Sequence, residues 1–331
     1  MIPVEEIRTT ALRALTKGGL SLDHATIQLD LLLDAEMRGV PSHGLLRVPR
    51  VIERVANGVT DPTTKGAQSW RGRAFLDVDG KQGLGPVVAL LALETARDRA
   101  AETGSCVVAV RNCDHLGMLA FYAEKLASEG KVLLGMTISE ALVHPFGGRQ
   151  AMLGTNPITI GVPAEPLPFV FDMATSLVSM GKIHDHAHRG VSIPEGWALD
   201  AEGNSTTDPD AAKLGAIAPF GGAKGYGLGL AFEVLVSALT GSAIGTAVKG
   251  TLDSMNPCNK GDVFVVMEPA LSVVPLVSGF LEDIRHSAPV DPAEPVRIPG
   301  DRAVATRERA SREGLTVASE VWDRIRLLAE V

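Results

Sequence analysis

The chain has few aromatic residues, few cysteines and no long hydrophobic run. Phe, Trp and Tyr make up 4% of its 331 residues, so we expect a core built mainly from aliphatic side chains. The three cysteines, Cys106, Cys113 and Cys258, contain no Cys-x-x-Cys pair. This argues against a disulfide framework and a thiolate zinc site, and it predicts a reducing, cytoplasmic location. No apolar stretch is long enough to span a bilayer and the acidic N-terminus is unlike a signal peptide, so we expect no membrane partner.

An excess of positive charge is also missing. The net charge is −8 and the isoelectric point is near 5.5. Because nucleic acid binding needs a basic face, these values argue against nucleic acid as the main partner. Hydrophobic residues at 45% and charged residues at 21% are typical of a soluble globular protein, and the length allows two domains or one large one.

The Gly-x-Gly-x-x-Gly opening of the common dinucleotide-binding fold is absent. The nearest sequence is Gly83-Leu84-Gly85, which Pro86 follows, with no third glycine at the required place. A nucleotide would therefore bind by another route. The chain has instead many turn-forming and hydrogen-bonding residues at 147–157 and 171–176. A backbone that approaches a polar ligand closely has this composition.

Hydrophobic periodicity predicts helices at both ends of the chain and a sheet between them. The first sixty residues predict one helix that ends at Gly18-Gly19, a second over 22–38, and a third over about 43–57 with Ser42 as its N-cap. The middle of the chain predicts strands at 74–79, 105–110, 131–138, 158–162, 169–172 and 263–267, and helices at 86–103, 117–130 and 225–239. Helices return at 270–286, 303–313 and 318–330. The pattern predicts an α+β fold with a mixed-sheet domain at 71–285 and a helical domain made from 1–70 and 286–331.

Two histidine motifs could carry chemistry. On the predicted third helix, His43 and Arg47 would share a face. The guanidinium could bind the carboxylate of a 2-hydroxy or 2-oxo acid while the imidazole handles the proton, although His43 could also be a merely polar residue at an exposed helix start. His115 follows a predicted strand and opens a predicted helix, a common position for site residues, and a simple helix cap is the alternative.

Two other motifs are more ambiguous. Lys224 begins a strongly apolar helix, where a cation suits phosphate or carboxylate binding, but it could equally be a surface lysine. The segment His184-Asp185-His186-Ala187-His188 would place three histidines on one side of a strand. No strand pattern surrounds it, so we predict an exposed loop there and no metal site.

Taken in order, these segments resemble the malate/L-lactate/sulfolactate dehydrogenase family, which are NAD(P)-dependent 2-hydroxy acid dehydrogenases without a Rossmann fold. The resemblance covers nearly the whole chain, and residues 193–196, 248–251 and 258–262 look most like the sulfolactate dehydrogenase branch. Eight motifs carry it in the family's order: Ser42-His43-Gly44 with Arg47 and Pro49, Asp114-His115-Leu116-Gly117, Pro145-Phe146-Gly147-Gly148, Leu153-Gly154-Thr155-Asn156-Pro157, Asp172-Met173-Ala174-Thr175, Gly181-Lys182-Ile183, residues 221–228, and Pro299-Gly300-Asp301.

The resemblance implies a role for each of these segments. His115 would be the proton acceptor during oxidation of the alcohol, with Ser42 and His43 beside it in the catalytic pocket. Arg47 would bind the substrate carboxylate, and Thr155 and His144 would also contact the substrate. NAD or NADP would contact the following residues: Leu116, Gly117, Ser139, Asp172, Met173, Ala174, Lys224, Pro299, Gly300 and Asp301. Family members are homodimers or larger, and partner residues close the site.

One departure from the family pattern concerns the proton acceptor. The family commonly has asparagine where this chain has Asp114. A carboxylate next to His115 is expected to favour the protonated imidazole. The pH optimum for oxidation would then move upward.

The predicted reaction is hydride transfer between nicotinamide and a small 2-hydroxy acid, either sulfolactate/sulfopyruvate or malate/oxaloacetate. A dianionic substrate needs a second cation, and Arg149, Lys182 and a protonated His144 are the candidates. The alternatives are a reductase of cyclic imino acids and a catalytically silent nucleotide-binding relative. Imine-reducing relatives tend to carry an acid where this chain has Lys182, which favours the hydroxy acid.

Overall fold

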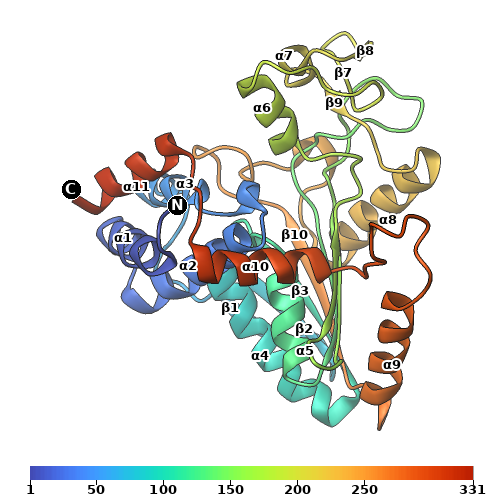
Figure 1. Ribbon diagram of the computed structural model, residues 1–331. Helices are drawn as coiled ribbons and strands as arrows, with labels where there is room; N and C mark the ends of the chain where they lie inside the picture. The colour runs from blue at the N-terminus through green and yellow to red at the C-terminus, as the bar shows by residue number, and fades with distance from the viewer. Residues whose placement is uncertain (331) are drawn as a thin grey trace.

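A seven-stranded mixed sheet forms the centre of the computed structural model, which describes residues 1–330 (Figure 1). Its strand order is β1-β2-β3-β10-β4-β5-β6, and only the β2–β3 pair is parallel. The strands are β1 (Ala67–Trp70), β2 (Phe75–Gly83), β3 (Ser105–Cys113), β4 (Val132–Thr137), β5 (Ile158–Val162), β6 (Phe169–Met173) and β10 (Gly261–Met267). A second, small sheet has the order β8-β7-β9, with β7 (Ala198–Leu199), β8 (Ser205–Thr206) and β9 (Ala216–Ile217). The α+β prediction is confirmed.

Helices cover both faces of the large sheet. On one face lie α4 (Gly85–Thr103) and α5 (Ala120–Ser128), and on the other lies α8 (Ala223–Thr240). Strand alternation separates the two cores: Phe264 and Val266 of β10 face α4 and α5, whereas Val263 packs with Phe232 of α8. The small sheet carries α6 (Met180–His188) and α7 (Pro209–Ala212), and α9 (Val273–Arg285) follows β10.

The two ends of the chain lie side by side (Figure 1). They contribute α1 (Val4–Lys17), α2 (Leu22–Met37), α3 (Arg47–Ala56), α10 (Asp301–Glu313) and α11 (Ser319–Glu330). Helix α11 contacts α1 and α3, and α10 contacts α2. We propose on this basis that residues 1–70 and 286–331 form one helical unit, of which residue 331 lies outside the described part. Strand β1 (Ala67–Trp70) lies entirely before residue 71 although it belongs to the large sheet. One continuous hydrophobic cluster also joins α1 and α2 of the helical unit to α4 of the sheet domain.

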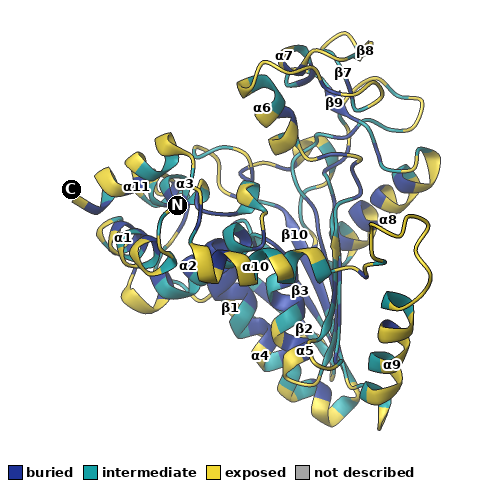
Figure 2. Cartoon of the chain, in the orientation of Figure 1, coloured by how far each residue is buried: buried dark blue, intermediate teal, exposed yellow. Residues whose placement is uncertain are grey.

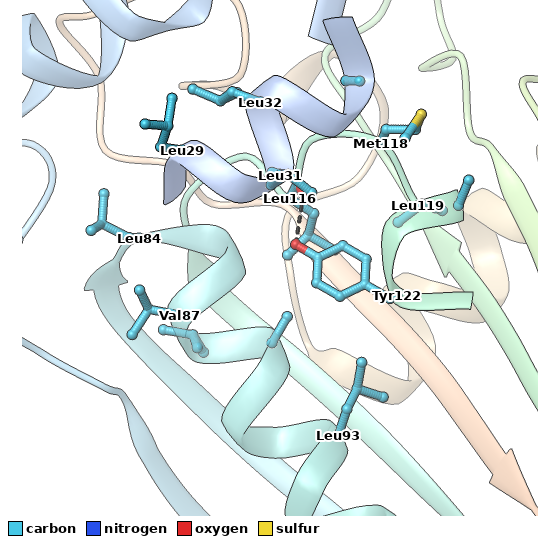
Figure 3. Packing of buried hydrophobic residues seen from close by; sticks show 14 of the residues in the cluster. Leu29, Leu31, Leu32, Leu84, Val87, Leu93, Leu116, Met118, Leu119 and Tyr122 are labelled. Atoms are coloured by element: carbon cyan, nitrogen blue, oxygen red, sulfur yellow. Dashed lines mark hydrogen bonds between the residues drawn. The ribbon is translucent and has the colours of Figure 1, made fainter. Parts of the chain in front are cut away.

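The core is mainly aliphatic, as the composition predicts. Figure 3 shows leucines of α2, α4 and the segment before α5 packed around Tyr122. Tyr122 is fully buried, and its hydroxyl donates a hydrogen bond to the Leu116 carbonyl at 2.7 Å. This bond satisfies the one polar atom of the ring, and it fixes the backbone of the segment that carries His115.

The predicted third helix at 43–57 is wrong. Residues Pro41–His43 form a 3-10 turn, and α3 begins only at Arg47. Pro49 explains the difference: in a helix that began at residue 43, its ring would clash with the carbonyl of Leu45. In α3 it occupies the first turn, where no backbone N–H is needed. Ser42 is therefore not an N-cap of α3.

Two other local predictions also need correction. The predicted helix at 117–130 starts at Ala120, because Gly117 has a positive φ of 74° that a right-handed helix does not allow. The histidines at 184, 186 and 188 lie on helix α6 rather than in a loop, and His184 and His188 are exposed. Ser179 caps that helix by accepting a hydrogen bond from the Lys182 N–H. Among residues 1–330, no helix combines the length and apolarity needed to cross a bilayer.

Leu93 of α4 provides a test of the core. Its side chain is completely buried, so Leu93→Ala should lower the free energy of unfolding by about 2–5 kcal/mol through lost burial and a new cavity. Urea unfolding measures the change. Leu327→Ala on α11, where the leucine is 49% exposed, is the control and should have a much smaller effect. Equal losses in the two variants would contradict this description of the core.

Candidate active site

A large cleft of about 1790 Å³ runs between the sheet and the N-terminal part of α10. Eight of the predicted site residues line it, namely His43, Gly117, Thr155, Asp172, Ala174, Pro299, Gly300 and Asp301. They come from the 3-10 turn, from the ends of β3, β5 and β6, and from the turn before α10. The cleft thus joins segments that are far apart in the sequence.

Two histidine rings face each other at the inner end of the cleft. The centroids of His43 and His115 are 5.4 Å apart, and the rings are inclined by 38°. The Gly117 N–H donates a hydrogen bond to Nδ1 of His115 at 2.9 Å. The neutral ring of His115 therefore carries its proton on Nε2. Nδ1 of His43 lies 3.0 Å from the Ser42 hydroxyl, which can donate or accept, so either tautomer of His43 is compatible with this contact.

Both histidines are held in the neutral form. Burial and the nearby Arg47 charge lower the pKa of His43 to about 4. Burial lowers the pKa of His115 well below its usual value, and the charges of Arg47 and Lys260 lower it further. The hydrogen bond from Gly117 acts in the same direction, because a protonated ring would direct an N–H at another N–H.

The expectation that Asp114 favours protonated His115 is wrong. The Asp114 carboxylate accepts hydrogen bonds from Nε of Arg54 at 3.0 Å and from the Thr60 hydroxyl at 2.7 Å. It also accepts the backbone N–H of His115 at 2.9 Å. The negative charge of Asp114 is therefore paired with the buried Arg54 guanidinium. The carboxylate orients the backbone of His115 rather than its imidazole. Nothing in the sequence indicates this Arg54–Asp114 pair, because its two residues are sixty positions apart.

A smaller inner cavity of about 30 Å³ lies next to His115. Gly117 lines both cavities, so the inner cavity adjoins the large cleft. Arg47 lines the inner cavity and anchors its guanidinium through Nε, which donates to the Ser42 carbonyl at 3.0 Å. Burial and the neighbouring Arg50 lower the pKa of Arg47 to about 10, so it remains a cation at neutral pH. The predicted His43–Arg47 pair is thus brought together without the shared helix.

The large cleft has the size and the polar groups that a dinucleotide needs. Asp172 accepts the Ala120 N–H at 2.7 Å at the start of α5 and presents its carboxylate to the cleft, where a ribose hydroxyl could donate to it. Enclosure by the cleft walls raises the pKa of Asp172 to about 6. Arg302 and Arg309 line the same cleft and form no ion pair within residues 1–330, so they are suited to a pyrophosphate, whereas Arg38 and Arg285 are already paired with carboxylates. The residues present therefore fit NAD or NADP.

Several predicted residues do not line either cavity: Ser42, Leu116, Ser139, His144, Met173 and Lys224. Two of them contact residues that line the large cleft. The Ser139 hydroxyl accepts a hydrogen bond from the Thr155 N–H at 3.1 Å, and the Ser42 hydroxyl lies 3.0 Å from Nδ1 of His43. Lys224 is exposed in the first turn of α8. Among residues 1–330, no three His, Cys, Asp or Glu side chains are grouped as metal ligands.

Sequence reasoning missed Arg50 and Arg54, which line the inner cavity together with Arg47. Their spacing of three and four residues was the available signal, because it places all three on one face of a helix. The predicted helix over 43–57 already contained all three positions, and only the structure shows that their shared face lines a cavity beside His115.

The depressed pKa of His43 predicts a loss of stability in acid. Between pH 6.5 and about 4 the unfolded chain binds a proton on His43 that the folded chain does not, so the free energy of unfolding falls as the pH falls through this window. The contribution at pH 4 is on the order of 1–3 kcal/mol. Denaturant unfolding at pH 7 and pH 4 should show a smaller acid loss for His43→Gln than for the wild type. The same loss in both proteins would refute the assignment.

Comparison with known proteins shows the family of this chain. The family model described as malate/L-lactate dehydrogenase matches residues 2–326. L-Sulfolactate dehydrogenase of Methanocaldococcus jannaschii is 36% identical over 318 residues, which cover 94% of this chain and 91% of that protein. A solved structure of sulfolactate dehydrogenase from the same organism has a TM-score of 0.92 at 34% identity, covering 99% of this chain and 96% of that one. A solved dehydrogenase from Sinorhizobium meliloti has a TM-score of 0.96 at 50% identity, covering 99% of this chain and 97% of that one. The chain belongs to the malate/L-lactate dehydrogenase family.

Proposed function

We propose that this NAD(P)-dependent 2-hydroxy acid dehydrogenase acts on sulfolactate/sulfopyruvate or malate/oxaloacetate. One observation carries the proposal: the His43–His115 pair lies beside Arg47 where a dinucleotide-sized cleft meets the inner cavity. Oxidation of a 2-hydroxy acid requires a carboxylate anchor, a group that takes the hydroxyl proton and a cofactor site. In this proposal Arg47 would be the carboxylate anchor, the histidine pair would handle the proton, and the large cleft would be the cofactor site.

The substrate carboxylate would bind Arg47. A guanidinium forms paired, charge-assisted hydrogen bonds with a carboxylate, and Arg47 has no acidic partner within salt-bridge distance among residues 1–330. The bound carboxylate would offset the Arg47 charge that lowers the pKa of both histidines. Substrate binding would therefore make the histidines better proton acceptors.

The two histidines would have different roles. His115 presents an Nε2–H, which can donate to the oxygen on C2 of the substrate. His43 can present a free Nε2 when its Nδ1–H donates to Ser42, so it would accept the hydroxyl proton during oxidation. Asp172, Ala174 and the Pro299–Asp301 turn would hold the cofactor, and bound nicotinamide would supply the hydride acceptor.

Nicotinamide absorbance measured with 2-hydroxy acids and cyclic imines, each with NAD and NADP, tests the activity. Turnover of sulfolactate or malate supports the proposal. Turnover of cyclic imino acids alone would replace it with the reductase alternative. Cofactor binding without turnover of any substrate would indicate the silent relative. The same panel decides between NAD and NADP.

Substitution of His115 tests its role as a donor. His115→Ala should lower kcat by about 100- to 1,000-fold, the range typical of a lost hydrogen-bond donor to the reacting oxygen. His115→Gln keeps an N–H donor but has no basic nitrogen, so it should retain clearly more activity than the alanine variant. Equal activity of the two variants would identify His115 as the proton acceptor instead. His188→Ala, on the exposed side of α6, is the control and should behave as the wild type.

We also propose a homodimer that uses the outer face of α8. Figure 2 shows exposed residues along this helix, and several of them are large and apolar: Leu228, Leu230, Val234 and Leu235. A soluble monomer rarely leaves so many neighbouring apolar side chains in water. Lys224 is the second residue of helix α8, so a partner on this face would lie close to a predicted cofactor residue.

Val234→Asp tests this interface. The residue is 52% exposed in the single chain, so a charge there should not disturb the core but should be costly in a dry interface. Light scattering after size-exclusion chromatography should report a monomer for Val234→Asp and a dimer for the wild type. Leu22→Asp, at an exposed position on α2, is the control and should remain dimeric. A dimeric Val234→Asp variant would place the interface elsewhere.

The cysteines support a proposal about location. Cys106, Cys113 and Cys258 are all buried and unpaired. Burial raises the pKa of each thiol, which keeps it protonated and unreactive. Free thiols are typical of a reducing compartment, so we propose the cytoplasm.

A further inference from the structure

Three arginines form a stripe along one face of α3. Arg47, Arg50 and Arg54 are three and four residues apart, and all three line the inner cavity next to His115. We refer to these three residues as the arginine stripe. Such a concentration of positive charge beside the reacting groups is unusual in a chain whose net charge is −8.

The stripe is only partly neutralised. Asp114 is the one acidic residue that lines the inner cavity, and its carboxylate is bound by Nε of Arg54. Nη1 of Arg54 donates to the carbonyls of Asp253 and Asn256, but Nη2 is buried and has no hydrogen-bond partner. Within residues 1–330, the Arg50 side chain makes neither a hydrogen bond nor an ion pair, although it is half-buried.

This arrangement favours a bound anion. Two guanidinium groups, Arg47 and Arg50, face one small cavity without a carboxylate partner, and the charge of Arg50 lowers the pKa of Arg47. Anionic groups bound at these arginines would offset this repulsion, and one bound beside Arg50 would also satisfy Nη2 of Arg54. A volume of about 30 Å³ holds roughly two waters, so the inner cavity would take one anionic group while the rest of the substrate lies in the adjoining cleft.

We propose that the arginine stripe binds a second anionic group of the substrate, with Arg47 holding the carboxylate on C2 and Arg50, assisted by Nη2 of Arg54, holding a distal carboxylate or sulfonate. The inference rests on the proposed function and assigns the residues that would bind the second negative charge of its substrate. Arg50 would thus be the specificity-determining residue. The cations first considered, Arg149, Lys182 and His144, line neither cavity in the single chain, and Lys182 lies over the ring of Trp197 at 5.0 Å.

The test compares dianionic and monoanionic substrates in wild type and Arg50→Gln. For L-malate and 3-sulfolactate, kcat/KM should fall about 10- to 100-fold more than for L-lactate, as expected for the loss of a hydrogen bond to a charged group. Arg50→Lys keeps the charge without the planar guanidinium and should recover part of the loss. Arg326→Gln, an exposed arginine on α11, is the matched control and should leave all three values unchanged. A larger loss of kcat/KM for L-malate would identify the distal group as a carboxylate, and a larger loss for 3-sulfolactate would identify it as a sulfonate.

A binding measurement separates this inference from the proposed function. Calorimetric titration of L-malate and L-lactate uses protein saturated with reduced cofactor, a combination that cannot react. Weaker malate binding in Arg50→Gln, with a smaller change for lactate, supports the stripe even if turnover is absent. Equal changes for malate and lactate, or no malate binding to the wild type, would overturn it. Failure of every hydroxy acid to react would count against the proposed function alone.

Discussion

The buried ion pair between Arg54 and Asp114 holds the parts of the active site together. It joins helix α3 to the segment that follows strand β3, and both partners are almost completely shielded from water. Removing one partner would leave an uncompensated charge in the interior, which is strongly unfavourable. The pair therefore fixes Arg47 and Arg50, on the same helix as Arg54, relative to His115, which directly follows Asp114.

The charge environment of the histidines follows from this arrangement. Because Asp114 is bound by Arg54 and Thr60, its negative charge does not offset Arg47 and Arg50 at the imidazoles. The site of the free protein is thus cationic at its arginines and neutral at its histidines. An anionic substrate would complete the charge balance, and its binding would change the proton affinity of the groups that act on it. In the proposed reaction, anion binding and proton transfer would be coupled through the same guanidinium groups.

Periodicity was sufficient to predict most elements of the fold. The six large strands with clear apolar runs and the long helices were found close to their observed bounds, because each has one face in the core. The failures occurred where a single residue overrides the pattern. Pro49 sets the start of α3, and the positive φ of Gly117 delays α5. Strand β1 was missed because three of its four residues are exposed, so no apolar alternation marks it.

By itself, the sequence determined the fold class, the family and the identities of His43, Arg47 and His115 as neighbouring candidates. These depend on motifs and on periodic burial, which are local properties of the chain. Only the tertiary structure decided the partner of Asp114, the tautomer of His115 and the arginines that line the inner cavity. The physical reason is that charge pairing acts through space. The Asp114 carboxylate pairs with Arg54, sixty positions away in the chain. The neighbouring His115 donates only its backbone N–H to that carboxylate, and its imidazole makes no hydrogen bond with it.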